Sequence, residues 1–329
     1  MSDMTTITKP DLTLLDPVRE QQQEMETQLL ARVDARRSPL EAALASLIAA
    51  GGKRLRPRIA LLAGGMLHAE PEALVHLAAA VEMLHTASLI HDDLVDGSGL
   101  RRGVETLNAR WSAAASVLVG DLAFTRAAEL ILGTRTLPVI EMFTRTMSVM
   151  VDGEVTQLAR EGGISGRDEY FRWIGAKTAA LFELAAGAPA LLSPAGEQAL
   201  PTARRFGYGI GMAFQIVDDV LDFTGNPSIL GKPVGSDLRQ GVLTLPALLY
   251  LEAHPGDPQL GKIIRRESLE EAALKGLIER IRRSEAANLS LEMAHGFVRE
   301  ALDELACLPE GPERFALVEI ALDIVIRDQ

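Results

Sequence analysis

Apolar residues recur at intervals of three and four along almost the whole chain from about Val18 onward. This is the spacing of α-helices that bury one face. Ala, Leu, Glu, Arg and Met, which favour helices, are abundant in the same region. A two-residue alternation of apolar and polar positions, which would indicate strands, is hard to find. The pattern therefore predicts an all-α protein.

Twelve helices are predicted, and several exceed twenty residues and are apolar on more than one side, as helices in the middle of a bundle are. They cover residues 18–34, 40–50, 56–67, 71–95, 105–132, 139–160, 167–188, 197–223, 243–252, 269–283, 288–307 and 314–327. Residues 1–15 are polar and are expected to form a flexible N-terminal arm. No linker rich in Pro, Gly or Ser divides the remainder, so residues 16–329 are expected to form a single helical domain.

One acidic pattern, D-D-x-x-D, occurs twice inside otherwise apolar segments, at residues 92–96 and 218–222. Positions i and i+4 stack on one helix face, so each copy crowds three carboxylates onto one turn. Such like charges repel and cost stability. Hard divalent cations prefer oxygen ligands, and Mg²⁺ shares its coordination with substrate phosphates. The pattern indicates a metal-dependent site for a phosphate-bearing ligand.

Cationic residues lie close to these clusters. Residues 51–58 (GGKRLRPR) pack four cations behind a Gly-Gly turn, which suits diphosphate oxygens or, alternatively, a solvated helix start. Arg101 and Arg102 follow the first cluster in a glycine-flanked loop, where they either bind a phosphate or balance the aspartates. His85 precedes Asp92 by two helical turns, which is about 10 Å along nearly the same face.

Weaker signals accompany the second cluster. Lys177 and Thr178 lie in an apolar helix, where a lysine must reach solvent or meet an anion. Gln215 precedes the second cluster by three residues, and Lys232 lies in the loop after it. A solvated or packing role also fits each of these alone. The run GYGIG at 207–211 is not interpreted as a nucleotide loop, because no strand precedes it; close helix packing explains it better.

Composition narrows the class of protein. The chain has 329 residues, 47% of them hydrophobic, and a net charge of −12, which argues against a nucleic-acid binder. A single cysteine, Cys307, excludes an internal disulfide and fits a reducing compartment. The sequence shows no signal peptide and no apolar run near the length of a bilayer span. We expect a cytoplasmic protein without a transmembrane segment, which an apolar product could bring transiently to a membrane.

In this order and spacing the motifs resemble the trans-isoprenyl diphosphate synthases, the polyprenyl synthetase family. The resemblance covers Gly51 to Pro246 and rests on GGKRLRP, HDDLVD with the following RRG, KT, FQIVDDVLD and GKPVGSDL. It implies a bundle of the isoprenoid synthase type with a central substrate cavity. It also implies a homodimeric, Mg²⁺-dependent prenyltransferase that condenses isopentenyl diphosphate head to tail with an allylic diphosphate.

The resemblance also implies a role for individual residues. Asp92 and Asp96, assisted by Asp93, would bind Mg²⁺ on one side of the site. On the opposite side, Mg²⁺ would be bound by Asp218, Asp219 and Asp222. Isopentenyl diphosphate would be bound by Lys53, Arg56, His85 and Arg102. The allylic diphosphate would be bound by Arg101, Lys177, Thr178, Gln215 and Lys232, with Lys177 also counted as catalytic. Val242 stands where relatives usually carry a further lysine, so one phosphate contact is missing or supplied otherwise.

Small residues before the first cluster bear on product length. Relatives that stop early carry bulky aromatics four or five residues before the first aspartate, where this chain has Ser88 and Ala87, with Leu84 one turn lower. From Val81 to Asp92 a helix rises about 16 Å, which leaves room for several isoprene units. We expect a medium-to-long all-trans polyprenyl diphosphate.

Three alternatives stay open. One is a farnesyl or geranylgeranyl diphosphate synthase with a shorter product. A second is a class I terpene cyclase, which shares the bundle but usually has an Asn/Ser/Glu pattern in place of the second cluster and lacks KRLR. A third is a non-catalytic partner subunit, which would be expected to lose an acidic motif, although both are intact here. The chain could also be the catalytic half of a heteromeric enzyme.

Overall fold

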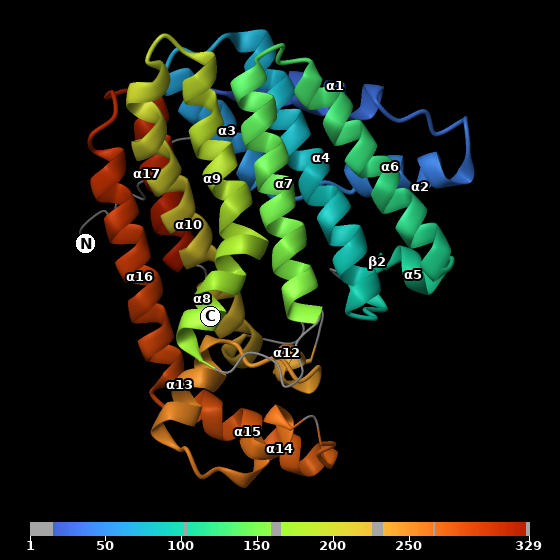
Figure 1. The fold of residues 1–329 in the computed structure, drawn as a ribbon, viewed down its shortest axis with the longest axis vertical. Helices are drawn as coiled ribbons and strands as arrows, with labels where there is room; N and C mark the ends of the chain where they lie inside the picture. Colours follow the sequence, from blue (N-terminus) through green and yellow to red (C-terminus); the bar gives the residue numbers. More distant parts are fainter. Residues whose placement is uncertain (1–15, 102–103, 159–165, 226–232, 266, 327–329) are drawn as a thin grey trace, which may run out of the picture.

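Helices make up nearly every element of the computed structural model, which describes residues 16–101, 104–158, 166–225, 233–265 and 267–326 (Figure 1). The expected N-terminal arm, residues 1–15, lies outside the described residues. The helices are α1 (Arg19–Ala31), α2 (Pro39–Ala49), α3 (Leu55–Met66), α4 (Pro71–Val95), α5 (Leu107–Arg110), α6 (Ala113–Leu132), α7 (Leu137–Leu158), α8 (Arg167–Ile174), the π-helix η2 (Gly175–Ala179), α9 (Ala180–Gly187), the 3₁₀-helix η3 (Ala188–Leu192), α10 (Gly196–Thr224), α12 (Ser236–Arg239), α13 (Leu245–Ala253), α14 (Pro258–Ile264), α15 (Glu271–Arg283), α16 (Ala286–Leu305) and α17 (Pro312–Ile326).

The predicted all-α class is confirmed, and one predicted helix is wrong at its start. The segment expected as one helix over 105–132 begins with a two-stranded antiparallel ladder, β1 (Leu100–Arg101) and β2 (Val104–Glu105), and then the short α5. The side chains of Thr106 and Ser112 cap α5 and α6, since each accepts a hydrogen bond from a backbone N–H of its helix. The two N-caps therefore begin two separate helices, α5 and α6, within the segment that the apolar period predicts as one helix.

Other differences concern short or irregular elements. The sequence analysis missed α12 and α14, whose few residues are too short for a helical period to be recognised. The predicted helix over 167–188 is interrupted by η2, where one turn widens. Residues 159, 160 and 327, which were expected at helix ends, lie outside the described residues.

Helix α4 occupies the interior of the bundle and packs against α1, α3 and α6 (Figure 1). Its start is well defined, because Pro71 opens the first turn and the Glu70 carboxylate accepts hydrogen bonds from the backbone N–H groups of Glu72 and Ala73. The prediction that no apolar run approaches the length of a bilayer span is wrong, because α4 is long and apolar enough by composition. Its most apolar window is 72% buried within the protein, as in a core helix of a bundle.

Helix α10 packs against α9, η2 and α16, and its glycines allow the close approach. A Cβ on Gly211 would lie 2.5 Å from the Cα of Ala179, and one on Gly207 would collide with the carbonyl oxygen of Phe182. Both glycines lie inside α10, which confirms their interpretation as helix-packing residues. The acidic turns lie near the C-terminal ends of α4 and α10, and both ends lie in the lower half of the bundle in Figure 1.

We predict that Gly211→Ala destabilises the protein by about 1–3 kcal/mol, because the added methyl group meets backbone atoms that cannot move aside independently. Gly296→Ala on α16 is the matched control. A Cβ there meets nothing within 4 Å, so the better helix propensity of alanine should stabilise the protein by about 0.5–1 kcal/mol. Urea unfolding of both variants tests this; equal midpoints would contradict it.

Candidate active site

The first acidic turn lies at the C-terminal end of α4. Asp92 and Asp93 are half-buried, and Asp96, the C-cap residue, is exposed. A helix C-terminus already carries partial negative charge, so three carboxylates there add to the field instead of compensating it. This turn is electrostatically unfavourable unless positive charge lies against it.

Lys177 supplies part of that positive charge. Its Nζ lies 2.8 Å from Oε1 of Glu154 on α7 and 3.5 Å from Oδ1 of Asp92. Burial lowers the pKa of Lys177, but the Asp92 and Glu154 carboxylates outweigh that effect, and the pKa is raised overall. Burial raises the pKa of Glu154 despite the nearby ammonium. Lys177 therefore stays charged and links α4 to α7.

Glu154 was missed in the sequence analysis. Its signal was a carboxylate in the predominantly apolar helix α7, similar to the signal that singled out Lys177.

The local backbone explains the position of Lys177 and Thr178. Both lie in η2, a π-helical turn of five residues between α8 and α9. Such turns are rare and frequently occur at functional sites, because the wider turn changes the direction of side chains. The sequence analysis expected a regular helix here.

The second acidic turn is more deeply buried and forms a hydrogen-bond network. Thr178 Oγ1 donates to Gln215 Oε1 at 2.7 Å, and Gln215 Nε2 donates to Asp219 Oδ1 at 2.8 Å. Tyr170 Oη donates to the other oxygen of Asp219 at 2.6 Å. Burial, the largest cause, and the Asp237 carboxylate raise the pKa of Asp219, against these two hydrogen bonds. The network joins α8, η2 and α10, and Tyr170 was missed in the sequence analysis.

The other two aspartates of this turn differ in exposure. Asp218 is half-buried, whereas Asp222 is buried. Oδ2 of Asp222 accepts a hydrogen bond from the backbone N–H of Asp237 at 3.2 Å. Asp218 is thus the most accessible carboxylate of the second turn.

Two of the predicted diphosphate-binding residues are neighbours in the structure. Nη1 of Arg56 lies 3.1 Å from Nε2 of His85. The Arg56 guanidinium lies 4.4 Å from the ring centroid of Phe182 and 5.6 Å from that of Phe214. Stacking on aromatic faces orients a guanidinium and leaves its edge available for an anion. Lys53 is exposed at the start of this segment.

The cationic segment divides into residues with different tasks. Arg54 is buried; its Nη1 donates to Glu82 at 2.6 Å and its Nη2 to the carbonyl oxygen of Ile48 at 2.6 Å. Arg58 pairs with Asp16 at 3.3 Å. Arg54 therefore holds α3 against α4, and Arg56 is the segment's arginine at the candidate site.

The three residues predicted to control product length are buried to different extents. Ala87 and Leu84 are fully buried, whereas Ser88 is half-buried and its hydroxyl donates to the carbonyl oxygen of His85 at 2.8 Å. Ser88 lies one turn before Asp92 on the same face, so among these three it is the position with accessible surface below the acidic turn.

Some predicted residues cannot be placed. Arg102 and Lys232 lie outside the described residues, and so does the side chain of Arg101, whose backbone forms part of β1. Val242 is half-buried, and its backbone N–H donates to the carbonyl oxygen of Asp237 at 2.9 Å.

The carboxylates suit a cation that takes few protein ligands. Among the residues that the structure describes, no three His, Cys, Asp or Glu side chains converge to enclose a metal ion. The accessible donors are nevertheless carboxylate oxygens on two helix ends, which fits Mg²⁺, an ion that completes its coordination with water and phosphate oxygens.

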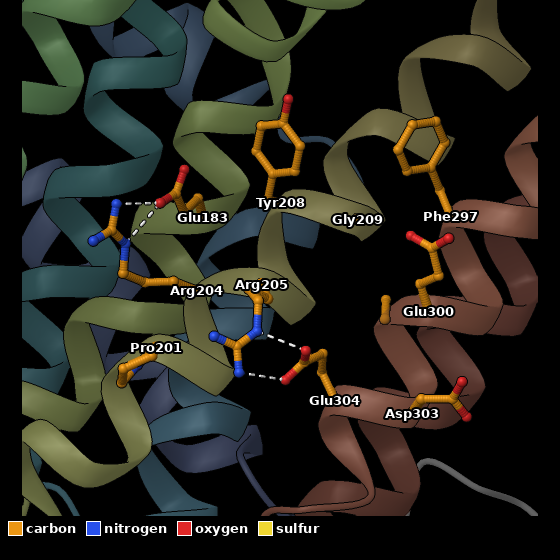
Figure 2. A pocket seen from close by; sticks show the side chains of 11 residues that line it. Glu183, Pro201, Arg204, Arg205, Tyr208, Gly209, Phe297, Glu300, Asp303 and Glu304 are labelled. Carbon is orange, nitrogen blue, oxygen red and sulfur yellow. Dashed lines mark hydrogen bonds and ion pairs between the residues drawn. The ribbon is translucent and has the colours of Figure 1, made fainter.

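A separate cavity of about 740 Å³ lies between α9, α10 and α16 (Figure 2). Its two arginines are already paired: Nε of Arg204 lies 2.6 Å from Glu183, and Nε of Arg205 lies 2.6 Å from Glu304. None of its lining residues belongs to the predicted site. The cavity is therefore distinct from the candidate active site.

Known polyprenyl synthases are similar to this chain in sequence and in fold. The profile of the polyprenyl synthetase family matches residues 37–281. Octaprenyl diphosphate synthase of Escherichia coli (strain K12) is 38% identical over 288 residues, which cover 86% of this chain and 88% of that protein. A crystal structure of a polyprenyl synthase from Caulobacter crescentus CB15, complexed with calcium and isoprenyl diphosphate, aligns with a TM-score of 0.89 at 36% identity and 97% coverage of both chains. A decaprenyl diphosphate synthase from Rhodobacter capsulatus aligns with a TM-score of 0.88 at 34% identity, covering 97% of this chain and 100% of that one.

The division of the cationic segment can be tested by stability. We predict that Arg54→Met lowers the free energy of unfolding by about 3–5 kcal/mol, because it leaves the Glu82 carboxylate buried without its partner. The matched change Arg56→Met should cost less than about half of that, because Arg56 is only half-buried and lies against His85 and the ring of Phe182, contacts that cost less to lose than a buried ion pair. Urea denaturation measures both, and a larger loss for Arg56→Met would show that the assignment is reversed.

Proposed function

The chain belongs to the polyprenyl synthetase family, and we propose how its two acidic turns and their cationic neighbours carry out the reaction. It is a prenyltransferase, a polyprenyl diphosphate synthase with a medium-to-long product. One observation carries the assignment of the site: the adjacent residues Lys177 and Thr178 connect the two acidic turns, the first through Asp92 and the second through Gln215 and Asp219.

Mg²⁺ would be held by Asp92 and Asp96, assisted by Asp93, on α4, and by the accessible Asp218 on α10. Asp219 and Asp222 lie in the same turn of α10 and are buried. When bound, the ion supplies positive charge that stabilises a departing diphosphate. Support comes from the oxygen-only donor set and from the Caulobacter relative, whose structure contains calcium with isoprenyl diphosphate.

The cationic side chains bind the two substrates. Lys177, with Arg101 and Lys232, binds the allylic diphosphate, and Thr178 and Gln215 lie beside it. Lys53, Arg56, His85 and Arg102 bind isopentenyl diphosphate, and the aromatic rings under Arg56 hold its guanidinium in place.

Charge and water exclusion then account for the reaction. Fixed cationic groups stabilise charge that develops on the leaving diphosphate, since they need no reorganisation during the reaction. The allylic carbon is attacked head to tail by isopentenyl diphosphate, and the released diphosphate accepts the proton that is lost. The apolar interior of the bundle keeps water from the cationic carbon.

We propose a homodimer with a cytoplasmic location. Apolar side chains that are exposed in the single chain gather on the neighbouring helices α6 and α7: Val117, Leu118, Leu132, Leu137, Val149, Val151, Val155 and Leu158. A second copy would cover this surface, because exposed apolar patches of this kind mark interaction sites. The apolar product would bring the enzyme to a membrane only transiently.

Turnover with defined substrates tests the function. We predict that the purified protein elongates allylic primers with isopentenyl diphosphate when Mg²⁺ is present and not when it is chelated. Asp92→Ala should reduce turnover at least about 100-fold and leave the unfolding midpoint within a few degrees, because the change removes a carboxylate from an already repulsive turn. Product sizing by chromatography supplies the measurement. Absence of elongation with every primer would refute the function, and near-normal activity of Asp92→Ala would refute the metal assignment.

The length of the prenyl product tests whether the growing product lies along α4 below Asp92. We predict that Ser88→Phe shortens the product, because a ring one turn below Asp92 blocks the accessible face of α4. Ser88→Ala is the control without added bulk and should keep the native distribution. Ala87→Phe should also shorten the product, with a loss of stability because Ala87 is fully buried. An unchanged distribution in Ser88→Phe would show that the product follows another wall.

A further inference from the structure

We propose that Tyr170 and Asp219 form a buried positioning pair that fixes the orientation of the Gln215 amide and the Thr178 hydroxyl, and that Asp219 does this in place of binding the metal directly. This inference rests on the proposed function and deepens it. It assigns different roles to the adjacent carboxylates of Asp218 and Asp219, which the sequence pattern places in one metal motif.

Burial separates Asp219 from Asp218 and from the aspartates of the first turn, and its contacts separate it from Asp222, which is also buried but accepts a hydrogen bond from the backbone N–H of Asp237. Only 2% of Asp219 is exposed, and Tyr170, which is 0% exposed, lies on the far side of it from Gln215. Each carboxylate oxygen of Asp219 accepts a hydrogen bond from a protein side chain, at 2.6 and 2.8 Å. Asp92, Asp93 and Asp218 are half-buried and Asp96 is exposed, which leaves them more accessible to a bound ion.

Asp219 orients the Thr178 hydroxyl through Gln215, because each hydrogen bond of the network has a fixed donor and acceptor. The NH₂ group of Gln215 faces Asp219, so its carbonyl oxygen faces Thr178, and Thr178 must donate its only hydroxyl hydrogen to it. Thr178 therefore offers a ligand lone pairs and no hydrogen. Tyr170 and Asp219 thus determine whether Thr178 offers the allylic substrate a hydrogen-bond donor or acceptor. Neither of the two residues contacts the substrate itself in this proposal.

Reversing the network gives a specific test. In Asp219→Asn the side chain acquires an NH₂ group, so the Gln215 amide can turn round and direct its own NH₂ group at Thr178. All members stay hydrogen-bonded, but the donor and acceptor roles at Thr178 are inverted. Tyr170→Phe instead removes the hydroxyl that donates to Oδ2 of Asp219, so this buried oxygen loses that hydrogen bond.

The experiment measures steady-state kinetics and metal binding in parallel. We expect Asp219→Asn and Tyr170→Phe to lower kcat/KM for the allylic primer about 10- to 100-fold, because a small misplacement of positioning groups is costly. The KM for isopentenyl diphosphate should change less than about twofold, since the residues assigned to that substrate lie outside the network. Calorimetric affinity for Mn²⁺ with inorganic pyrophosphate should also stay within about twofold of wild type in both variants and fall at least about tenfold in Asp218→Asn.

Tyr250→Phe is the matched control. Tyr250 is a buried tyrosine on α13 whose hydroxyl lies 3.5 Å from the carboxylate of Asp257, outside the network. Its kinetic constants should stay at wild-type values.

The outcomes discriminate between the two proposals. A tenfold loss of metal affinity in Asp219→Asn would make Asp219 a ligand and overturn the inference. Wild-type allylic kinetics in Tyr170→Phe would reduce the pair to a structural contact and overturn it as well. Because calorimetry needs no turnover, it tests Asp219 even if the wild-type protein fails to elongate any primer, which would count against the proposed function alone.

Discussion

Electrostatic repulsion at the ends of two buried helices is the constraint around which the rest of the site is arranged. Both acidic turns lie near helix C-termini, where the peptide dipoles already contribute negative charge. Folding must therefore hold carboxylates together against their own field. Lys177 relieves the first turn, and hydrogen bonds from Tyr170 and Gln215 relieve Asp219 in the second. The surrounding helices are the frame that makes these compensating contacts available.

Close packing is what brings the compensating groups into reach. The glycines of α10 let this helix approach α9 and η2 until backbone atoms are nearly in contact, which a Cβ would prevent. The wider turn of η2 then directs Lys177 and Thr178 toward different helices. Steric and electrostatic requirements are thus coupled, since the network at Asp219 depends on a distance that small residues set.

Much of the fold was predictable because it is encoded locally. The bounds of α4 follow from Pro71 and its apolar period, and the D-D-x-x-D spacing alone indicates carboxylates on one face. What sequence could not supply were tertiary partners. Arg54 and Arg56 are two residues apart and look alike, yet one pairs with the buried Glu82 and the other stacks on Phe182. Tyr170 is separated from Asp219 by 49 positions, and no local pattern connects them.

The position of Lys177 also bears on how two helices share one positive charge. Its ammonium lies between Asp92 and Glu154, carboxylates from two different helices. The lysine is thus a counterion that α4 and α7 share. Placing the ammonium beside both carboxylates avoids the cost of leaving any one of these three charges partly buried and unpaired. Because Glu154 lies outside both acidic turns, Lys177 keeps one carboxylate partner even if Asp92 binds another cation.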